Sequence, residues 1–335
     1  MVIKRDGDKM GLYKLRVEDD DINKGVLEKV VSQSIDYEKL FESWLENSPD
    51  VLLEEETILW IGRQLNIQVG DGNKYPDLIG INSKGDIVIC ELKKGKTPRE
   101  VIAQILEYAS WAKSLTYEDL NNICKRYYQN DELLKGKELI EVFKEVFYPE
   151  DDEDINIIFN NQQRLFIIAE EISKVVLEVI NYLNSEYFVP IIGVEYSVYK
   201  SSEGEFIVNT NKCCGFEKIK NFNTSNTSSN SGGWNECIPV KDVIYNAVKK
   251  MTSLDNNKIF KPIEVIREVE KNYPNVNKTT VRCQLIQDCV NHTSRKHYPN
   301  GQRDLYFLVS KGNYRLYNKS TDGVWNFKGE SINKK

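Results

Sequence analysis

Two short apolar runs, residues 78–82 and 86–92, lie in the first third of the chain and are joined by a glycine-containing segment, residues 83–85. Apolar runs of this length with so short a connection are typical of a β-hairpin. If the strands pair symmetrically about the middle of the connection, Asp77 lies opposite Glu91. Directly opposed residues in an antiparallel pair have Cβ atoms roughly 4.5–5.5 Å apart. The hairpin therefore predicts two neighbouring carboxylates at its open end.

The period of two in the second strand sorts its side chains onto two faces. One face holds Ile87, Ile89, Glu91 and Lys93, and the other holds Val88, Cys90 and Leu92. Two carboxylates brought together at the end of an apolar hairpin repel each other, so the arrangement favours a bound cation with Lys93 beside it. Two alternatives stay open. A bulge at Gly85 would shift the register by one residue, and Glu-x-Lys alone is also typical of a solvated strand end.

A helix is predicted directly after the hairpin. Thr97 can cap it and Pro98 suits its first turn, and apolar residues recur at helical spacing up to Ala112. Gln104 and Tyr108 then lie one turn apart on the same face. On the residues alone, Tyr108 is a core residue and Gln104 a surface residue.

The pattern on either side of these elements predicts one α/β domain. Before them, residues 1–36 predict a small hairpin and a helix. After them, the pattern predicts helical material at about 117–148, strand-like segments at 155–159 and 164–169, a helix at 170–183 and a strand at 189–199.

The order of polar side chains along these elements resembles the PD-(D/E)XK nuclease superfamily. A carboxylate on an early helix is followed by Pro-Asp on one strand, Glu-Leu-Lys on the next and Gln-x-x-x-Tyr on the following helix. The resemblance is closest to the catalytic domain of NucS-type endonucleases, covers residues 37–114 and continues more weakly to Ser201. It implies an α/β fold of the restriction-endonuclease type, with a mixed sheet flanked by helices.

The resemblance also implies roles for individual residues. Asp77, Glu91 and the backbone carbonyl of Leu92 would bind a metal ion. Lys93 would orient or activate the attacking water and stabilise charge on the phosphate. Three further residues would complete the site, two by bracing it and one as the early helical carboxylate: Gln104, Tyr108 and Glu42.

The chemistry of phosphodiester hydrolysis fits these residue types. A cation neutralises developing charge and lowers the pKa of a bound water, and a positive side chain stabilises the phosphate. Oxygen ligands favour Mg²⁺, for which Mn²⁺ can substitute, over zinc. The two histidines of the chain, His292 and His297, lie far from this cluster in sequence, which argues against a histidine-based nuclease or a zinc hydrolase. No phosphate-binding Gly-x-x-x-x-Gly-Lys-Ser/Thr sequence supports the use of ATP.

Composition adds a cellular setting to this prediction. The 335 residues, 40% hydrophobic and 29% charged, can form two or three compact units. No run approaches the roughly 18–20 apolar residues that cross a bilayer, and the N-terminus has no apolar signal region. Seven cysteines without a Cys-x-x-Cys pair suit reduced thiols. We therefore expect a cytoplasmic protein with no membrane association.

Charge divides the chain into an acidic and a basic part. Residues 238–335 hold 18 Lys and Arg against 9 Asp and Glu, whereas residues 1–237 hold 27 against 42. The polar, nearly uncharged stretch 221–233 between them is typical of a flexible linker, although a lid or binding loop is an alternative. The predicted organisation is an N-terminal extension (1–36), a nuclease domain (37–210), a linker (211–237), a winged-helix-like domain (238–320) and a tail (321–335).

The basic part follows the order of a winged-helix module. The pattern predicts helices at 240–251, at 263–271 and from 277 or 279 to about 290, followed by strands at 304–309 and 314–317. Winged-helix modules contact bases with a recognition helix and phosphates with the wing. The residues predicted to bind DNA are therefore Thr279, Thr280, Arg282 and Gln284 on the third helix, Arg295 and Lys296 after it, and Lys311 and Arg315 on the wing. A winged helix that binds protein remains the alternative.

These features together predict a metal-dependent endodeoxyribonuclease that is restriction-like and serves prokaryotic defence. Cutting both strands requires two active sites, so a homodimer is expected, and a methyltransferase or another defence protein is a candidate companion. The alternative is a NucS-like repair nuclease acting on mismatched or branched DNA. A catalytically inactive DNA-binding protein ranks lower, and RNA is a less favoured substrate.

Overall fold

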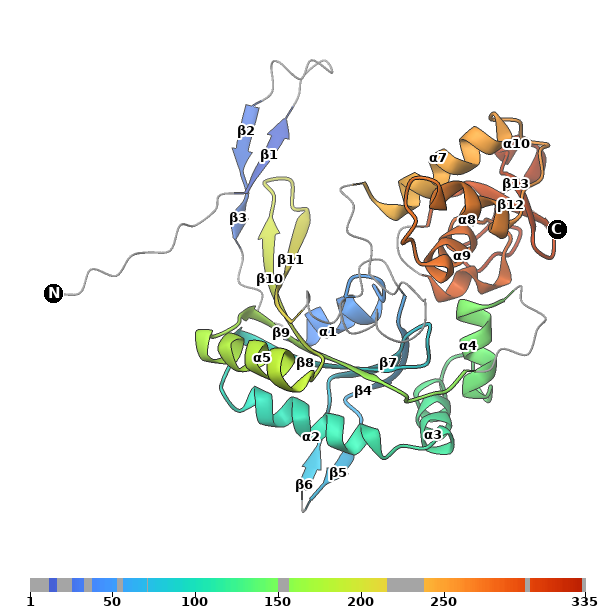
Figure 1. The fold of residues 1–335 in the computed structure, drawn as a ribbon. Coiled ribbons are helices and arrows are strands. Elements are labelled where there is room, and N and C mark those ends of the chain that lie inside the picture. The colour runs from blue at the N-terminus through green and yellow to red at the C-terminus, as the bar shows by residue number, and fades with distance from the viewer. Residues whose placement is uncertain are drawn as a thin grey trace.

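The computed structural model describes residues 12–16, 26–32, 38–52, 57–70, 72–149, 157–215, 238–298 and 302–332. A mixed sheet flanked by helices forms the larger part, and a helical module at the C-terminus lies beside helix α4 (Figure 1). Among the described residues, no helix is both long and apolar enough to span a bilayer.

The central sheet has seven strands among the described residues, in the order β11-β10-β9-β8-β7-β4, with β3 paired to β10. Strand β9 is parallel to β8 and β10, and the other pairs are antiparallel. This is the mixed α/β sheet predicted from the sequence. The strands are β3 (Val31–Ser32), β4 (Leu59–Arg63), β7 (Leu78–Ile81), β8 (Ile87–Lys96), β9 (Gln163–Glu171), β10 (Ile191–Lys200) and β11 (Phe206–Cys214).

Helices cover both faces of this sheet, which explains why its central strands are apolar on both sides. The face of Ile79 and Ile89 packs against the helices α2 (Val101–Lys113), α3 (Tyr117–Tyr127), α4 (Leu139–Phe147) and α5 (Lys174–Tyr187). The face of Val88 and Cys90 packs against α1 (Glu38–Glu46), where Phe41 stacks on Tyr196 of β10 with ring centroids 3.9 Å apart. Strand β8 is thus fixed between two hydrophobic layers.

Two small hairpins accompany the sheet. Strands β1 (Tyr13–Arg16) and β2 (Val26–Lys29) form one, which confirms the hairpin predicted within residues 1–36; the described part of that segment contains no helix. Strands β5 (Ile67–Val69) and β6 (Gly72–Lys74) form the other, between β4 and β7.

The C-terminal module has the predicted order of three helices and a hairpin. Its elements are α7 (Val240–Thr252), α8 (Pro262–Glu270), α9 (Lys278–Gln287), the short 3₁₀ helix η2 (Thr293–His297), β12 (Tyr306–Ser310), β13 (Asn313–Leu316) and α10 (Lys319–Asp322). Asn277 caps α9 by accepting a hydrogen bond from the Thr279 amide at 2.9 Å. The module has its own core, in which Phe260 bridges to Tyr314 of β13.

The strand predicted at residues 155–159 is not formed in its described part. Residues 157–160 run as coil and a turn. Ile157 and Phe159 pack on the core beside α4, and the Asn160 amide donates to the Gly85 carbonyl at 2.9 Å. The apolar residues of this segment therefore cover the turn of the β7–β8 hairpin instead of pairing as a strand.

Two predicted helix starts also need correction. The helix predicted at 170–183 begins only at Lys174, because β9 continues to Glu171. Thr97 does not cap α2, which begins at Val101. The Thr97 hydroxyl accepts a hydrogen bond from the Ser173 amide at 2.8 Å, so it fixes the start of α5 to the end of β8.

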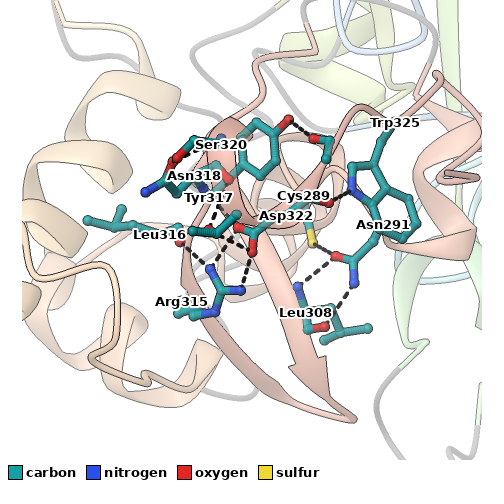
Figure 2. A network of polar contacts seen from close by, with 12 residues as sticks. Cys289, Asn291, Leu308, Arg315, Leu316, Tyr317, Asn318, Ser320, Asp322 and Trp325 are labelled. Atoms are coloured by element: carbon teal, nitrogen blue, oxygen red, sulfur yellow. Dashed lines mark hydrogen bonds and ion pairs between the residues drawn. The ribbon is translucent and has the colours of Figure 1, made fainter. Parts of the chain in front are cut away.

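The outer boundaries of the C-terminal half shift as well. Strand β11 runs to Cys214, so the predicted linker begins too early; residues 216–237 lie outside the described residues. The predicted tail is part of the module where it is described. The Trp325 indole donates to the Asp322 carbonyl at 2.8 Å (Figure 2) and its ring packs edge-on against Phe307.

Candidate active site

The β7–β8 hairpin has the register predicted from the sequence. Leu78 pairs with Cys90 and Ile81 with Ile87, so the pairing is symmetric about Lys84 and Gly85 does not shift it. Asp77 and Glu91 are the next residues in this register. The Asp77 Oδ2 accepts a hydrogen bond from the Leu92 amide at 2.7 Å, which holds the first carboxylate against the second strand.

Both carboxylates are buried. The exposed fraction is 8% for Asp77 and 1% for Glu91. Burial, and after it repulsion from Glu91, raises the pKa of Asp77 well above its ordinary value, although the Leu92 amide acts in the opposite direction. Two negative charges in this position repel each other, and a divalent cation would remove the repulsion.

Lys93 lies where the alternation along β8 predicts. Its ammonium forms an ion pair with the Glu91 carboxylate, and its side chain is 23% exposed whereas that of Glu91 is 2% exposed. The hairpin therefore carries a buried acidic pair with a cationic group at its rim.

Helix α2 brings two polar side chains to the same face of the sheet. The Gln104 amide donates to the Tyr108 hydroxyl at 2.8 Å, and Tyr108 is fully buried. The pKa of Tyr108 is raised to about 12. Burial is the main cause, and the negative charges of Glu91 and Asp77 contribute to the same shift. The phenol thus stays protonated at neutral pH beside the acidic pair.

Glu42 on α1 is also buried, at 1% exposure, and its charge contributes to the raised pKa of Asp77. It already has partners, because its carboxylate accepts hydrogen bonds from the Gln64 amide group at 3.1 Å and from the Arg63 Nε at 3.2 Å. The Arg63 Nη1 also donates a hydrogen bond to the Glu46 carboxylate at 2.7 Å. Glu42 therefore lies near the acidic pair, and its negative charge is balanced by Arg63 within a polar network.

Sequence reasoning missed Arg63 and Gln64. Gln64 has a φ of 44°, in the left-handed region, which directs its backbone amide to the Asp77 carbonyl at 2.9 Å. It thereby joins Glu42 to the Asp77 segment. The available signal was two long polar residues placed directly after the apolar run of β4, Leu59–Arg63.

The donor set for a metal ion is small. Among the described residues, no three His, Cys, Asp or Glu side chains gather as a ready-made ligand group. Asp77 and Glu91 supply carboxylate oxygens, and the Leu92 carbonyl follows directly on β8. Such an oxygen set, with water completing the shell, suits a hard cation of the Mg²⁺ type, so the residues present fit that ion.

The residues predicted to bind DNA are mostly engaged within the protein. Thr280 and Gln284 are buried, and the Gln284 amide group donates to Asp288 at 3.0 Å. Arg295 is 2% exposed and pairs with Asp304 at 2.6 Å. This differs from the expected exposed recognition surface. Thr279 and Arg282 are half-buried.

The two predicted wing residues, Arg315 and Lys311, differ in their exposure and contacts, and Lys296, predicted after the third helix, contacts the larger domain. Arg315 binds Asp322 through both terminal nitrogens, at 2.8 and 2.6 Å (Figure 2). Lys311 lies exposed at the turn between β12 and β13. Lys296 pairs with Glu145 of α4 at 3.5 Å.

Helix α9 is covered because the module docks against α4 of the larger domain (Figure 1). Cys283, Ile286 and Tyr298 belong to the core of that domain. The Tyr298 hydroxyl donates to the Val146 carbonyl, to which the Cys283 thiol also lies within 3.8 Å. Val281 and Leu285, on the other side of α9, pack into the core of the module.

The pKa shifts of two residues at this junction, Glu145 and His297, predict that docking depends on pH. A hydrogen bond from His297, at 3.2 Å, and contacts with Lys137 and Lys296 lower the pKa of Glu145 to about 2. Burial lowers the pKa of His297 despite Glu145. Both shifts give stability that is complete at neutral pH. The contribution of His297 to folding stability is lost as pH falls through the ordinary histidine range. The contribution of Glu145 is lost at lower pH.

We therefore expect the melting temperature of wild-type protein to fall more steeply between pH 7 and pH 5 than that of His297→Gln, because glutamine cannot acquire a proton there. Differential scanning calorimetry at several pH values measures this difference. Parallel curves for the two proteins would show that His297 is not linked to folding. His292 and Glu145 are present in both proteins, and the influence of His297 on their pKa values is part of the difference that is measured.

Comparison with protein families gives one match, in the C-terminal module. A family described as "Domain of unknown function (DUF7669)" matches residues 239–316, which span α7 to β13. No curated protein matches the chain.

Two solved structures share a low similarity with the chain. The EndoMS-dsDNA2 complex has 14% identity over 55% of this chain and 65% of that chain, with a TM-score of 0.24. A repair endonuclease from Pyrococcus abyssi has 12% identity over 52% and 62%, also with a TM-score of 0.24. The chain thus spans less than two thirds of either protein.

Proposed function

We propose that this protein is a divalent-metal-dependent endodeoxyribonuclease. The observation that carries the proposal is the pair of buried carboxylates, Asp77 and Glu91, placed opposite each other on the β7–β8 hairpin with the Lys93 ammonium at the rim. A buried acidic pair is unfavourable without a counter-charge. A structural role would be served better by apolar residues, as elsewhere on this hairpin.

In this mechanism Asp77, Glu91 and the Leu92 carbonyl would hold Mg²⁺, for which Mn²⁺ could substitute. When bound, the ion supplies charge neutralisation at the phosphate and a more acidic water. Lys93 exchanges its contact with Glu91 for the phosphate or the attacking water, where its positive charge stabilises the developing negative charge. Tyr108, held by Gln104, keeps its proton and positions Glu91.

We further propose that the C-terminal module is a winged helix that holds DNA. Its three helices, its hairpin and the bridge from Phe260 to Tyr314 support this topology. In the docked arrangement α9 is covered, so Lys311, exposed at the turn between β12 and β13, is the predicted residue best placed to meet a phosphate backbone. Restriction-like defence and a homodimer, which would cut both strands, belong to the same proposal. A repair role on mismatched or branched DNA is the alternative substrate class.

Incubation of the purified protein with plasmid DNA tests this function. We expect discrete fragments with Mg²⁺ or Mn²⁺ and none with EDTA, since the acidic pair needs its cation. Methylated and unmethylated plasmids, and short mismatched or branched duplexes, identify the substrate class. Intact DNA in all of these reactions would contradict the proposal. The matched control is Asp77→Asn protein, which should leave all substrates intact.

A further inference from the structure

A two-stranded ribbon, formed by β5 and β6, leads directly into the candidate active site. It projects from the larger domain beside α2 (Figure 1). Strand β6 ends at Lys74, three residues before Asp77. An extended chain spans at most about 3.6 Å per residue, so the whole of β6 lies within roughly 20 Å of Asp77.

The ribbon has two different faces. Its register pairs Ile67 with Lys74 and Gln68 with Asn73, and directly opposed side chains share a face. Ile67 is buried in the core that α2 covers, and the Lys74 ammonium forms an ion pair with Glu107 of α2 at 3.1 Å. This face is therefore held against α2, and the face of Gln68 and Asn73 is directed away from it.

The outer face is exposed and carries no charge. Gln68 and Asn73 are both exposed, and neither side-chain amide has a hydrogen-bond partner among the described residues. Asn66 and Tyr75, two residues beyond them on either strand, are exposed as well. A solvated surface usually carries Lys or Glu, and 29% of this chain is charged. A face of three amides and a phenol is better suited to specific hydrogen bonds.

The ribbon also has the dimensions of a DNA-reading element. Its two strands lie roughly 4.8 Å apart, and the major groove of B-DNA, about 12 Å wide, admits a two-stranded ribbon. The amide of Gln or Asn binds adenine in this groove through the N6 and N7 atoms together. Contacts of this kind select a sequence, whereas contacts to phosphate only position the protein.

We propose that the β5–β6 ribbon enters the major groove of DNA and that Gln68 and Asn73 bind adenine there, near the bond that is cut. The inference rests on the proposed nuclease function and adds to it the means by which the substrate is selected. Asn73 precedes Asp77 by four residues, at most about 14 Å of chain. At 3.4 Å per base pair, the bound adenine lies within roughly five base pairs of the cleaved phosphate once side-chain reach is included.

Selection from a pool of random-sequence duplexes, bound in EDTA and then sequenced, tests this proposal without cleavage. We expect wild-type protein to enrich adenine at one or two positions. Gln68→Ala/Asn73→Ala protein should lose this enrichment, because alanine forms no hydrogen bond with a base. The matched control is Gln129→Ala/Asn130→Ala, which removes the same two amides from exposed residues after α3 and should enrich adenine as wild type does.

Replacement of the enriched adenine by 7-deazaadenine removes the N7 acceptor alone. In a labelled duplex, measured by anisotropy in EDTA, we expect this change to weaken wild-type binding roughly tenfold and to leave the affinity of the ribbon variant unchanged. Equal weakening of both proteins would overturn the proposal. So would an adenine preference that persists in the ribbon variant, or wild-type protein that shows none. A failure of the proposed nuclease function is recognised separately, by intact plasmid in the cleavage assay.

Discussion

Asp77→Asn protein is expected to cleave DNA roughly a thousandfold more slowly than wild type with saturating Mg²⁺, and yet to be more stable in EDTA. The loss follows because asparagine removes a charged metal ligand, and several kcal/mol of transition-state stabilisation corresponds to about three powers of ten in rate. Asparagine is nearly isosteric and its oxygen can still accept the hydrogen bond from the Leu92 amide. The fold should therefore persist.

The gain in stability follows from the same burial. Because the pKa of Asp77 is raised in the folded protein, its ionised form opposes folding, and this cost increases as pH rises from the ordinary aspartate range toward the raised pKa. Asparagine carries no charge at any of these pH values. The melting temperature of the variant in EDTA should thus exceed that of wild type by a few degrees at pH 7, and the difference should vanish in acid.

Mg²⁺ provides the control for this prediction. It should raise the melting temperature of wild-type protein by stabilising the acidic pair, and should have little effect on Asp77→Asn. Calorimetry with and without the ion measures both. Equal cleavage by the two proteins, or an equal response to Mg²⁺, would remove Asp77 from the metal site.

The acidic pair was predictable because it depends on local rules. Hairpin pairing follows from the length of the connection and the alternation of side chains, and these two features fix which residues oppose each other. The observed pairs, from Leu78 with Cys90 to Ile81 with Ile87, follow that prediction. Placement of Gln104 and Tyr108 one turn apart on α2 is equally local.

The surroundings of α9 were not predictable in this way. A helix that starts after Asn277 and carries Val281 and Leu285 is visible in the sequence, but docking against α4 depends on a surface more than a hundred residues away. One signal was available. Cys283 and Ile286 add a second apolar side to α9, and a helix that is apolar on two sides is covered on both.

Arg63 and Gln64 show a different limit. Their importance comes from a backbone turn with positive φ and from a buried carboxylate on another helix. Neither is encoded in a short repeating pattern. Long polar residues at the end of an apolar strand are equally typical of a solvated strand end, so only the folded arrangement distinguishes the two.

Tyr298→Ala is expected to cost about 3–5 kcal/mol of stability, as is usual for removal of a buried aromatic side chain. Tyr298 is 3% exposed, packs with Cys283 and Ile286 against the α4 side of the junction, and donates its hydroxyl to the Val146 carbonyl. Its loss leaves a cavity and a buried acceptor between the module and the larger domain. Tyr298→Phe keeps the ring and should cost only about 1 kcal/mol.

Hydrogen exchange distinguishes a loss of docking from general unfolding. We expect amides of α4 and α9 to exchange faster in Tyr298→Ala, while those of β8, enclosed between two hydrophobic layers, exchange at the wild-type rate. Wild-type protection of both helices would mean that other contacts hold the junction. The same variant uncovers the side of α9 that carries Cys283 and Ile286. If α9 is a DNA-recognition helix, Tyr298→Ala protein should bind duplex DNA more tightly than Tyr298→Phe protein. The reason is that the surface of α9 that binds α4 cannot bind DNA at the same time.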